Sequence, residues 1–279
     1  MPASIADRRA AFRRLHQSGC FVIPNPWDAG SAVWLQQLGF KALATTSSGC
    51  AWSKALPDNG VGLEAMLAHL EAIVAATEIP VNADFENAYA DEPEGVAAHV
   101  TRAVATGVAG LSVEDSTGRA DKPLYDFDLA LARVEAARRA IDQSGAGVVL
   151  TARAECFLVG HPDPLAESIR RLSAYAGAGA DCLYAPGLKT AEQIEAVVRA
   201  VAPKPVNVLV GAPGLTVAEL EKLGVRRIST GGALARMAWA GFISAARQIA
   251  EQGRFDAFAG GVTFAELDGF FRQRAGKAR

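Results

Sequence analysis

The sequence predicts an α/β protein built as an eight-stranded parallel β/α barrel, a TIM barrel. Short apolar runs rich in Val, Ile and Leu alternate eight times with longer segments of helical periodicity. Strands that are apolar throughout are typical of a parallel sheet with helices on its faces. A chain of 279 residues is long enough for one barrel, so we expect a single domain over residues 1–279.

Each element is predicted from a local signal. A helix comes first, because Ser4 and Asp7 have the spacing of a capping box before an apolar stripe that stops at Gly19. The predicted strands are 20–24, 41–45, 80–84, 110–114, 148–152, 181–185, 205–209 and 227–230. The predicted helices are 28–38, 62–77, 93–106, 128–143, 164–177, 190–201, 216–223 and 232–251. Aromatic residues at helical spacing in 256–275 predict a helical tail that covers the barrel or forms an interface.

Several predicted strands are preceded by the same sequence pattern, in which a helix ends in small residues and a glycine. The pattern occurs before Phe40, Val108, Asp181 and Val225. A glycine just past a helix adopts the left-handed conformation and turns the chain back toward the sheet. Repetition of this pattern favours one closed barrel. A doubly wound open sheet is the alternative.

Composition and charge exclude several classes of partner. Lys plus Arg number 28 and Asp plus Glu number 30, a net charge of −2, which is too nearly neutral for a nucleic-acid-binding surface. The most apolar predicted helix carries Arg236 and Arg247, so no membrane span is expected, and the first residues lack a secretory signal pattern. The four cysteines are widely separated, which indicates reduced thiols and a cytoplasmic protein.

Acidic residues gather at two neighbouring strand ends. They are Asp84, Glu86, Glu114 and Asp115. The active sites of β/α barrels lie at these strand ends, and carboxylates crowded there repel one another unless a cation intervenes. Oxygen ligands of this kind suit Mg²⁺, with Mn²⁺ as the alternative ion. The competing interpretation is that some of them, Asp115 above all, cap the helices that follow.

Other polar residues at strand ends can bind an anion. The run 45–49 after the second strand offers backbone amides and hydroxyls to a carboxylate, or it is a plain loop. Arg153 at the end of the fifth strand requires an anionic partner, either a substrate carboxylate or Glu155. Thr230-Gly-Gly is a weak phosphate-binding signal. The sequence contains neither an HExxH zinc motif nor a GxSxG nucleophile elbow.

In these residues the chain resembles the phosphoenolpyruvate mutase and isocitrate lyase superfamily, from about Asn25 to Gly241. The motifs that carry the resemblance are Asn25-Pro-Trp-Asp-Ala-Gly-Ser-Ala, Thr46-Ser-Ser-Gly, Pro57-Asp, Val81-Asn-Ala-Asp-Phe-Glu-Asn, Val113-Glu-Asp-Ser-Thr-Gly, Thr151-Ala-Arg, Ala178-Gly-Ala-Asp and Leu223-Gly-Val-Arg-Arg-Ile-Ser-Thr-Gly. Each motif occurs in order at its own strand end, which makes the set specific.

The resemblance implies a Mg²⁺-dependent barrel that forms or cleaves carbon–carbon or carbon–phosphorus bonds beside a 2-oxo acid, through an enolate. It implies metal ligands at Asp84 and Glu114 and places Asp58 near the water shell of the metal, and we expect Glu86, the additional acidic residue of the same motif, as a third ligand. By the same resemblance Arg153 binds substrate, and Arg153, Asp58 and Glu114 are the expected catalytic residues. The expected substrate contacts are Ser47, Ser48, Gly49, Trp27, Asp28, Arg153 and Asn207.

The chain also departs from the family pattern. Asn82 stands where the family's Asp-x-Asp metal motif begins, and the Lys-Lys-Cys-Gly-His signature of the isocitrate lyases is absent. The sixth strand ends in Tyr184-Ala-Pro, where mutases tend to have His. We therefore expect a Mg²⁺-dependent lyase that cleaves or decarboxylates a small 2-oxo acid or dicarboxylate. The alternatives are a phosphonate mutase or hydrolase and a non-catalytic metabolite-binding barrel. The resemblance further implies a homo-oligomer, a dimer or tetramer, in which the last barrel helix is exchanged between subunits.

Overall fold

The computed structural model describes residues 3–277, and the side chains of residues 3–274. Contacts divide the chain into two compact units, one up to Leu234 and one from Ala235 onward. The first unit contains all the strands found in the described residues. The prediction of a single domain over 1–279 stays a prediction.

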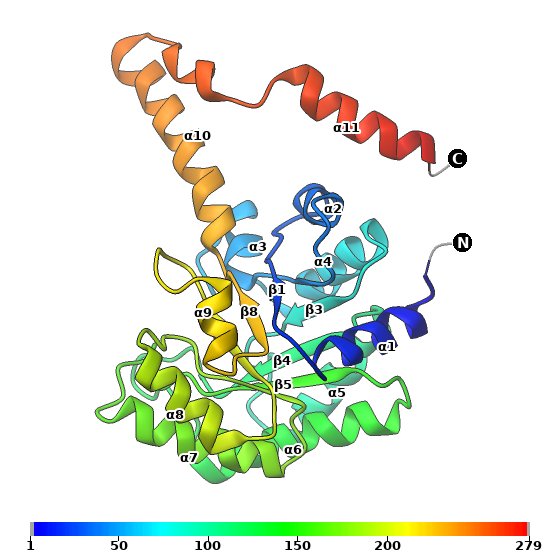
Figure 1. Cartoon of the computed structure of the whole chain (residues 1–279), viewed down its shortest axis with the longest axis vertical. Helices are drawn as coiled ribbons and strands as arrows, with labels where there is room; N and C mark the ends of the chain where they lie inside the picture. The colour runs from blue at the N-terminus through cyan, green and yellow to red at the C-terminus, as the bar shows by residue number, and fades with distance from the viewer. Residues whose placement is uncertain (1–2, 278–279) are drawn as a thin grey trace. The chain divides into compact units, whose positions relative to one another are not determined.

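The first unit is a TIM barrel, as predicted, with its strands at the centre and helices around them (Figure 1). Within residues 3–277, eight parallel strands pair in the order β1-β8-β7-β6-β5-β4-β3-β2. The strands are β1 Phe21–Ile23, β2 Leu43–Ala44, β3 Val81–Asp84, β4 Gly110–Glu114, β5 Val149–Arg153, β6 Cys182–Tyr184, β7 Val206–Leu209 and β8 Arg227–Ser229. The helices are α1 Ile5–Leu15, α2 Ala29–Gln37, α3 Ser47–Ser53, α4 Leu63–Ala76, α5 Pro93–Ala105, α6 Phe127–Gln143, α7 Pro164–Gly177, α8 Ala191–Val201 and α9 Val217–Lys222.

The seam between β1 and β2 completes the barrel. These two strands are the ends of the paired order, and the Ala44 N–H donates a hydrogen bond to the Pro24 carbonyl across the gap at 3.1 Å. The glycines expected to end helices have positive φ angles, 89° at Gly39, 91° at Gly107 and 85° at Gly224. The predicted mechanism for returning the chain to the sheet is therefore confirmed.

Helix α1 closes the amino-terminal end of the barrel. Its predicted capping box between Ser4 and Asp7 is present, and the Phe12 ring is fully buried in a cluster with Ile23, Ala44 and Val149. Gly110 on β4 makes room for that ring, because a Cβ built there would lie 2.5 Å from Phe12 Cε1. The carboxyl ends of the strands lie at the opposite end of the barrel, where the active site is expected.

His16, just after α1, makes the stability of this end dependent on pH. Burial and the nearby charges of Arg227, Arg13 and Arg226 lower the pKa of His16 to about 3. The folded protein keeps the ring neutral while the unfolded chain binds a proton below pH 6.5, so this contribution to stability is lost as the pH falls from 6.5 toward 3. We expect the free energy of unfolding to fall by an amount on the order of 4 kcal/mol over this pH range. Urea unfolding of wild type and His16→Gln between pH 7 and 4 measures it, and parallel stability curves for the two proteins would contradict the assignment.

The second unit is helical. It contains most of α10 Ala233–Gln252, the short 3₁₀ helix η1 Asp256–Gly260 and α11 Phe264–Lys277, which confirms a helical tail. Many of its large apolar side chains are exposed, namely Met237, Trp239, Phe242, Ile243, Phe255, Phe258, Val262, Phe264, Leu267 and Phe271.

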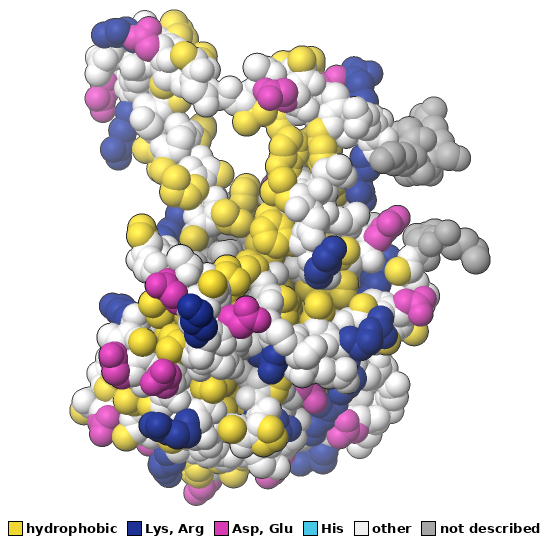
Figure 2. Space-filling view, viewed as in Figure 1, with side chains coloured by type: hydrophobic (Ala, Val, Ile, Leu, Met, Phe, Trp, Pro, Cys, Tyr) yellow, Lys and Arg dark blue, Asp and Glu magenta, His cyan; other side chains and the backbone are white. Residues whose placement is uncertain are grey.

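Among the described residues, no helix is long and apolar enough to cross a lipid bilayer. On the face shown in Figure 2, basic and acidic side chains are interspersed over the barrel. This distribution agrees with the net charge of −2.

Candidate active site

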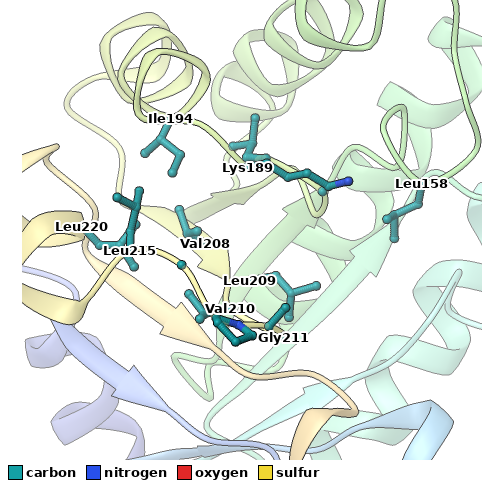
Figure 3. A pocket seen from close by; sticks show the side chains of 14 residues that line it. Leu158, Lys189, Ile194, Val208, Leu209, Val210, Gly211, Leu215 and Leu220 are labelled. Atoms are coloured by element: carbon teal, nitrogen blue, oxygen red, sulfur yellow. The ribbon is translucent and has the colours of Figure 1, made fainter.

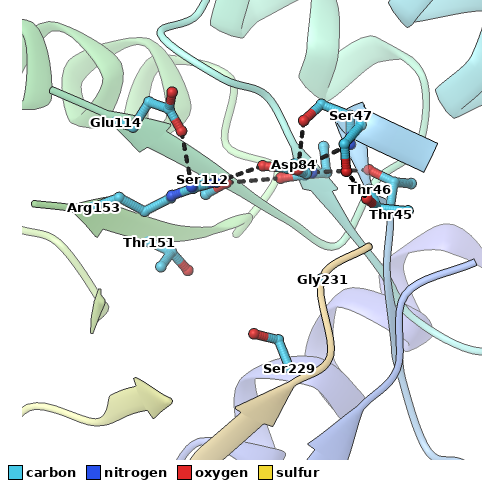
Figure 4. A network of polar contacts seen from close by, with 12 residues as sticks. Thr45, Thr46, Ser47, Asp84, Ser112, Glu114, Thr151, Arg153, Ser229 and Gly231 are labelled. Carbon is cyan, nitrogen blue, oxygen red and sulfur yellow. Dashed lines mark hydrogen bonds and ion pairs between the residues drawn. The ribbon is translucent and has the colours of Figure 1, made fainter. Parts of the chain in front are cut away.

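Arg153, the last residue of β5, lies among three carboxylates at the carboxyl end of the barrel. Its Nη1 contacts Asp84 Oδ1 at 2.7 Å, its Nη2 contacts Glu114 Oε2 at 3.0 Å, and its Nε contacts Glu155 Oε1 at 2.8 Å. Figure 4 shows the guanidinium extended from β5 toward Asp84, with Glu114 beside it on β4. The register explains the arrangement, because Glu114 pairs directly with Arg153 in the sheet.

The Arg153 cluster is sheltered but can be reached from solvent. The exposed fractions of the side chains are 14% for Arg153, 18% for Asp84 and 11% for Glu114. A guanidinium carries five N–H donors, and the three contacts to carboxylates use three nitrogen positions. Two N–H groups of Arg153 therefore remain for an anionic ligand.

The run 45–49, expected as an anion-binding loop, is the start of a helix. Thr46 caps α3, and its side chain accepts a hydrogen bond from the Gly49 N–H. The backbone N–H and the hydroxyl of Ser47 both donate to Asp84 Oδ2 at 2.9 Å. In this structure the Ser47 donors pair with the carboxylate of Asp84, and the expectation that the run 45–49 binds a substrate carboxylate stays a prediction.

Ser48 completes this side of the site. Its Oγ lies 3.0 Å from Thr46 Oγ1, and a Cβ built on Gly232 would come within 2.9 Å of Ser48 Oγ. The loop after β8 therefore lies directly against Ser48, and only glycine fits at position 232 without displacing it.

Carboxyl groups in and near the Arg153 cluster have raised pKa values. Burial and the charges of Asp84 and Asp58 raise the pKa of Glu86 to about 8. Burial, Glu155 and Asp84 raise the pKa of Glu114 well above its usual range, although Arg153 opposes the rise. Partial removal from water and the Asp84 carboxylate raise the pKa of Asp58 as well. The carboxyl groups at these strand ends outnumber the cations near them, so Arg153 alone cannot balance all of them in their ionised forms.

The donor chemistry of this cluster suits a hard divalent cation. Oε1 of Glu86 is buried and has no hydrogen-bond partner, which is costly unless a ligand or ion completes it. Within the described residues, no three His, Cys, Asp or Glu side chains already converge as a metal-binding group. The assignment of Asp84, Glu114 and Glu86 as metal ligands therefore stays a prediction.

Asn25 holds three strand ends of the site together. Its Oδ1 accepts hydrogen bonds from the Thr230 and Gly231 N–H groups at 2.8 and 2.9 Å, and its Nδ2 donates to the Thr45 carbonyl at 2.8 Å. The Thr230 and Gly231 amides of the weak phosphate-binding signal Thr230-Gly-Gly are thus occupied by a side chain of the protein itself.

Asn25→Ala is expected to destabilise the fold by about 2–4 kcal/mol, because it leaves buried backbone groups unpaired. Asn25→Asp keeps the acceptor for Thr230 and Gly231 and should lose less. The shift in denaturant midpoint at constant slope measures both effects. Equal midpoints for Asn25→Ala and wild type would contradict the bridging role.

Other predicted site residues lie outside the Arg153 cluster. Asp28 caps α2 and accepts a hydrogen bond from the Ser31 N–H, and the half-buried Trp27 precedes it. Asn207 is 1% exposed inside the barrel, where its amide contacts Ser229 and Arg227. These polar groups have protein partners in this structure, and substrate contacts by Trp27, Asp28 and Asn207 stay predictions.

Asp115 does not cap a helix, contrary to the alternative interpretation of its carboxylate. It is 3% exposed, and it accepts hydrogen bonds from the Glu155 N–H at 2.8 Å and from the Tyr175 hydroxyl at 2.7 Å. Arg171 Nη1 pairs with it at 3.0 Å. This network fixes the segment that follows Arg153 and connects it to α7. No short sequence motif signals it, because its members lie up to 60 positions apart.

The comparisons with known proteins agree with this geometry. A model of the phosphoenolpyruvate phosphomutase family matches residues 12–250. The chain therefore belongs to the phosphoenolpyruvate phosphomutase family, within the phosphoenolpyruvate mutase and isocitrate lyase superfamily, and the expectation of an enzyme of this superfamily is confirmed.

Relatives by sequence include an uncharacterised protein of Mycobacterium tuberculosis H37Rv, 35% identical, with 79% of this chain and 81% of the relative covered. An oxaloacetate decarboxylase of Pseudomonas putida GB-1 is 30% identical, with 83% and 81% covered.

Among solved structures, a Burkholderia cenocepacia J2315 protein assigned provisionally as a lyase or mutase is 46% identical, with a TM-score of 0.93 and 96% and 97% of the two chains covered. An oxaloacetate acetylhydrolase bound to its product oxalate is 27% identical, with a TM-score of 0.86 and 98% and 96% covered. A 2,3-dimethylmalate lyase is 26% identical, with a TM-score of 0.85 and 100% and 98% covered.

Proposed function

We propose that the protein is a metal-dependent lyase that cleaves a carbon–carbon bond, by decarboxylation or by fragmentation, in a small 2-oxo or 2-hydroxy dicarboxylate. The observation that carries the proposal is Arg153, which lies between Asp84 and Glu114 at the carboxyl end of a barrel of this family. The names of the relatives support the substrate class, since they act on oxaloacetate or on 2,3-dimethylmalate.

The roles of the residues follow from the charge that the reaction creates. When oxaloacetate decarboxylates, its C3–C4 bond breaks, CO₂ leaves, and the electron pair moves toward the C2 oxygen to form an enolate. A proton then adds at C3 to give pyruvate. The two free N–H groups of Arg153 would stabilise the negative oxygen, because a preorganised donor in a sheltered site lowers the barrier. A substrate carboxylate would take the Ser47 and Gly49 donors from their present partners Asp84 and Thr46, with the Ser48 hydroxyl beside them.

A divalent cation, Mg²⁺ or Mn²⁺, is part of the proposal. Asp84, Glu114 and Glu86 would hold it, with Asp58 near its water shell. The unpartnered Glu86 oxygen and the raised pKa values of this cluster support it. When bound, the cation supplies Lewis-acid stabilisation of the negative oxygen.

Product analysis separates the proposed reaction from the alternatives. We expect oxaloacetate to give pyruvate and CO₂, or oxalate and acetate, by ¹³C NMR, while ³¹P NMR of phosphonopyruvate incubations shows no change. Phosphonopyruvate conversion without oxaloacetate cleavage would favour a phosphonate mutase or hydrolase. A rise in melting temperature with Mg²⁺ and oxalate but no product from either compound would favour a binding protein.

The proposal includes a cytoplasmic homo-oligomer, a dimer or tetramer. The exposed apolar side chains of the second unit support self-association, since patches of this kind usually mark interfaces. The double substitution Phe242→Lys and Phe264→Lys, at side chains 62% and 82% exposed, is expected to lower the oligomeric state. Sedimentation velocity measures it, and an unchanged sedimentation coefficient would contradict the role of these two residues. Lys41→Ala, on an exposed residue of the barrel unit, is the control.

A further inference from the structure

Arg133 on α6 is a buried cation with no role in the proposed reaction. Lys189, the charged residue that lines an apolar pocket of about 360 Å³, is exposed (Figure 3). Arg133 is only 1% exposed. An arginine is seldom buried unless its donors are paired, because removing its charge from water costs free energy. The contacts of Arg133 therefore indicate what it stabilises.

The guanidinium of Arg133 holds the loop between β3 and α5, residues 85–92. Its Nη1 donates hydrogen bonds to the carbonyls of Ala90 and Asp91, the second at 2.8 Å, and its Nη2 donates to the carbonyl of Asn87 at 2.5 Å. One side chain on α6 thus binds three backbone carbonyls of this loop.

Tyr125 contacts both Arg133 and the loop. The centre of its ring lies 3.8 Å from Arg133 Cζ, which is a cation–π contact. Its hydroxyl donates to Asp91 Oδ1 at 2.5 Å and accepts a hydrogen bond from Asn87 Nδ2 at 3.2 Å. Arg133 and Tyr125 together tie the loop 85–92 to the helix that follows β4.

The loop 85–92 needs this support because its backbone adopts a conformation that residues with a Cβ disfavour. Glu86, Ala88 and Tyr89 have φ angles of 46°, 58° and 56°, which lie in the left-handed region. Each such residue costs free energy, and the conformation persists only where its surroundings hold it. Three left-handed residues within four positions therefore require a restraint, and Arg133 supplies one.

Glu86 is the residue of this loop that faces the carboxylate cluster. It is 5% exposed, and its carboxyl interacts with the charges of Asp84 and Asp58. Its backbone carbonyl accepts a hydrogen bond from the Glu114 N–H at 3.0 Å, which places it at the end of β4. Among the described residues, its buried Oε1 has no hydrogen-bond partner. The conformation of the loop therefore decides where an oxygen that is free to bind a ligand lies.

We propose that Arg133 is a positioning residue for Glu86. By binding the carbonyls of the loop, Arg133 fixes the left-handed turn that directs the free Glu86 oxygen to the proposed divalent cation. Arg133 acts through the loop and not by contact with the substrate. This inference rests on the proposed metal-dependent function, and it assigns a role to a residue outside the carboxylate cluster.

Mn²⁺ binding to the full-length protein, measured by electron paramagnetic resonance, tests this role without turnover. Arg133→Met should weaken Mn²⁺ binding by about 10–100-fold, the range found when a residue that orients a metal ligand is replaced. Arg133→Lys keeps the charge but cannot reach three carbonyls, so it should recover little of the affinity. Wild-type affinity for Mn²⁺ in both variants would overturn the proposal.

Arg138→Met is the matched control, because Arg138 lies on the same helix and pairs with Asp181 and Asp142 instead of the loop. It should bind Mn²⁺ as the wild type does. An equal loss of affinity in Arg138→Met and Arg133→Met would show a general effect of damage to α6 and would overturn the positioning role.

A double-mutant cycle separates positioning from general destabilisation. Glu86→Gln should weaken Mn²⁺ binding by itself, and Arg133→Met should add no further loss in the Glu86→Gln background. If Arg133→Met does not fold, Arg133→Lys and Tyr125→Phe take its place in the cycle. Wild-type affinity in Glu86→Gln, or an undiminished further loss in the double variant, would overturn the proposal. Absence of Mn²⁺ binding by the wild type would instead overturn the proposed cation, so the two failures are distinguishable.

Discussion

Replacing Arg153 with methionine is expected to abolish measurable oxaloacetate turnover and to destabilise the fold by about 3–5 kcal/mol. Methionine keeps much of the volume but removes the cation that contacts Asp84, Glu114 and Glu155. Three sheltered carboxylates are then left without their partner, and the negative oxygen of the intermediate loses two donors. Steady-state kinetics and urea unfolding measure the two effects on the same preparation.

Arg153→Lys is the matched control, because it keeps the charge but not the planar fork that reaches three carboxylates. It should recover much of the stability and little of the activity. Wild-type turnover in Arg153→Met would exclude this residue from catalysis, and wild-type stability would contradict its role in balancing the carboxylates.

Asp84→Ala is expected to lower turnover on the order of 10³-fold. Asp84 is a predicted metal ligand, and its two oxygens also connect Ser47 to Arg153. Loss of this carboxylate therefore disturbs both the cation and the anion-binding start of α3.

Ser47→Ala separates these roles, because it removes one hydrogen bond to Asp84 and leaves the carboxylate in place. We expect a smaller effect, a loss of kcat/KM of about tenfold that comes mainly from a higher KM. Equal losses of kcat in Ser47→Ala and Asp84→Ala would show that Asp84 acts only through Ser47. Both variants are measured by initial rates at saturating Mg²⁺.

The fold follows from the sequence because barrel patterns are local and repeated. The predicted helix 164–177 agrees with α7, and 128–143 differs from α6 by one residue. The main difference is α3, where a polar run without a helical stripe forms a helix. Thr46 caps α3 and belongs to the motif that is expected to bind an anion. The same residues therefore form both the start of a helix and the predicted anion-binding segment.

The site was predictable as a set of strand ends, but the connections within it were not. Each carboxylate was placed by its own motif, whereas the contact of Arg153 with Asp84 joins residues 69 positions apart. Crowded carboxylates alone predict an external cation, whereas the structure shows that Arg153 supplies part of the positive charge. Glu114 and Arg153 each end one of two adjacent strands, and this pairing is the signal that could have indicated a contact between them.

The proposed divalent cation is tested by removing it and returning it. Oxaloacetate turnover is measured on protein treated with chelator, before and after Mg²⁺ is added back, with the Asp84→Ala protein at the same Mg²⁺ concentration as the blank for metal-catalysed decarboxylation in solution. We predict negligible turnover without the ion and recovery with it only in the wild type. Full turnover after chelation, or equal Mg²⁺-dependent rates in wild type and Asp84→Ala, would contradict the claim that a cation completes this carboxylate cluster.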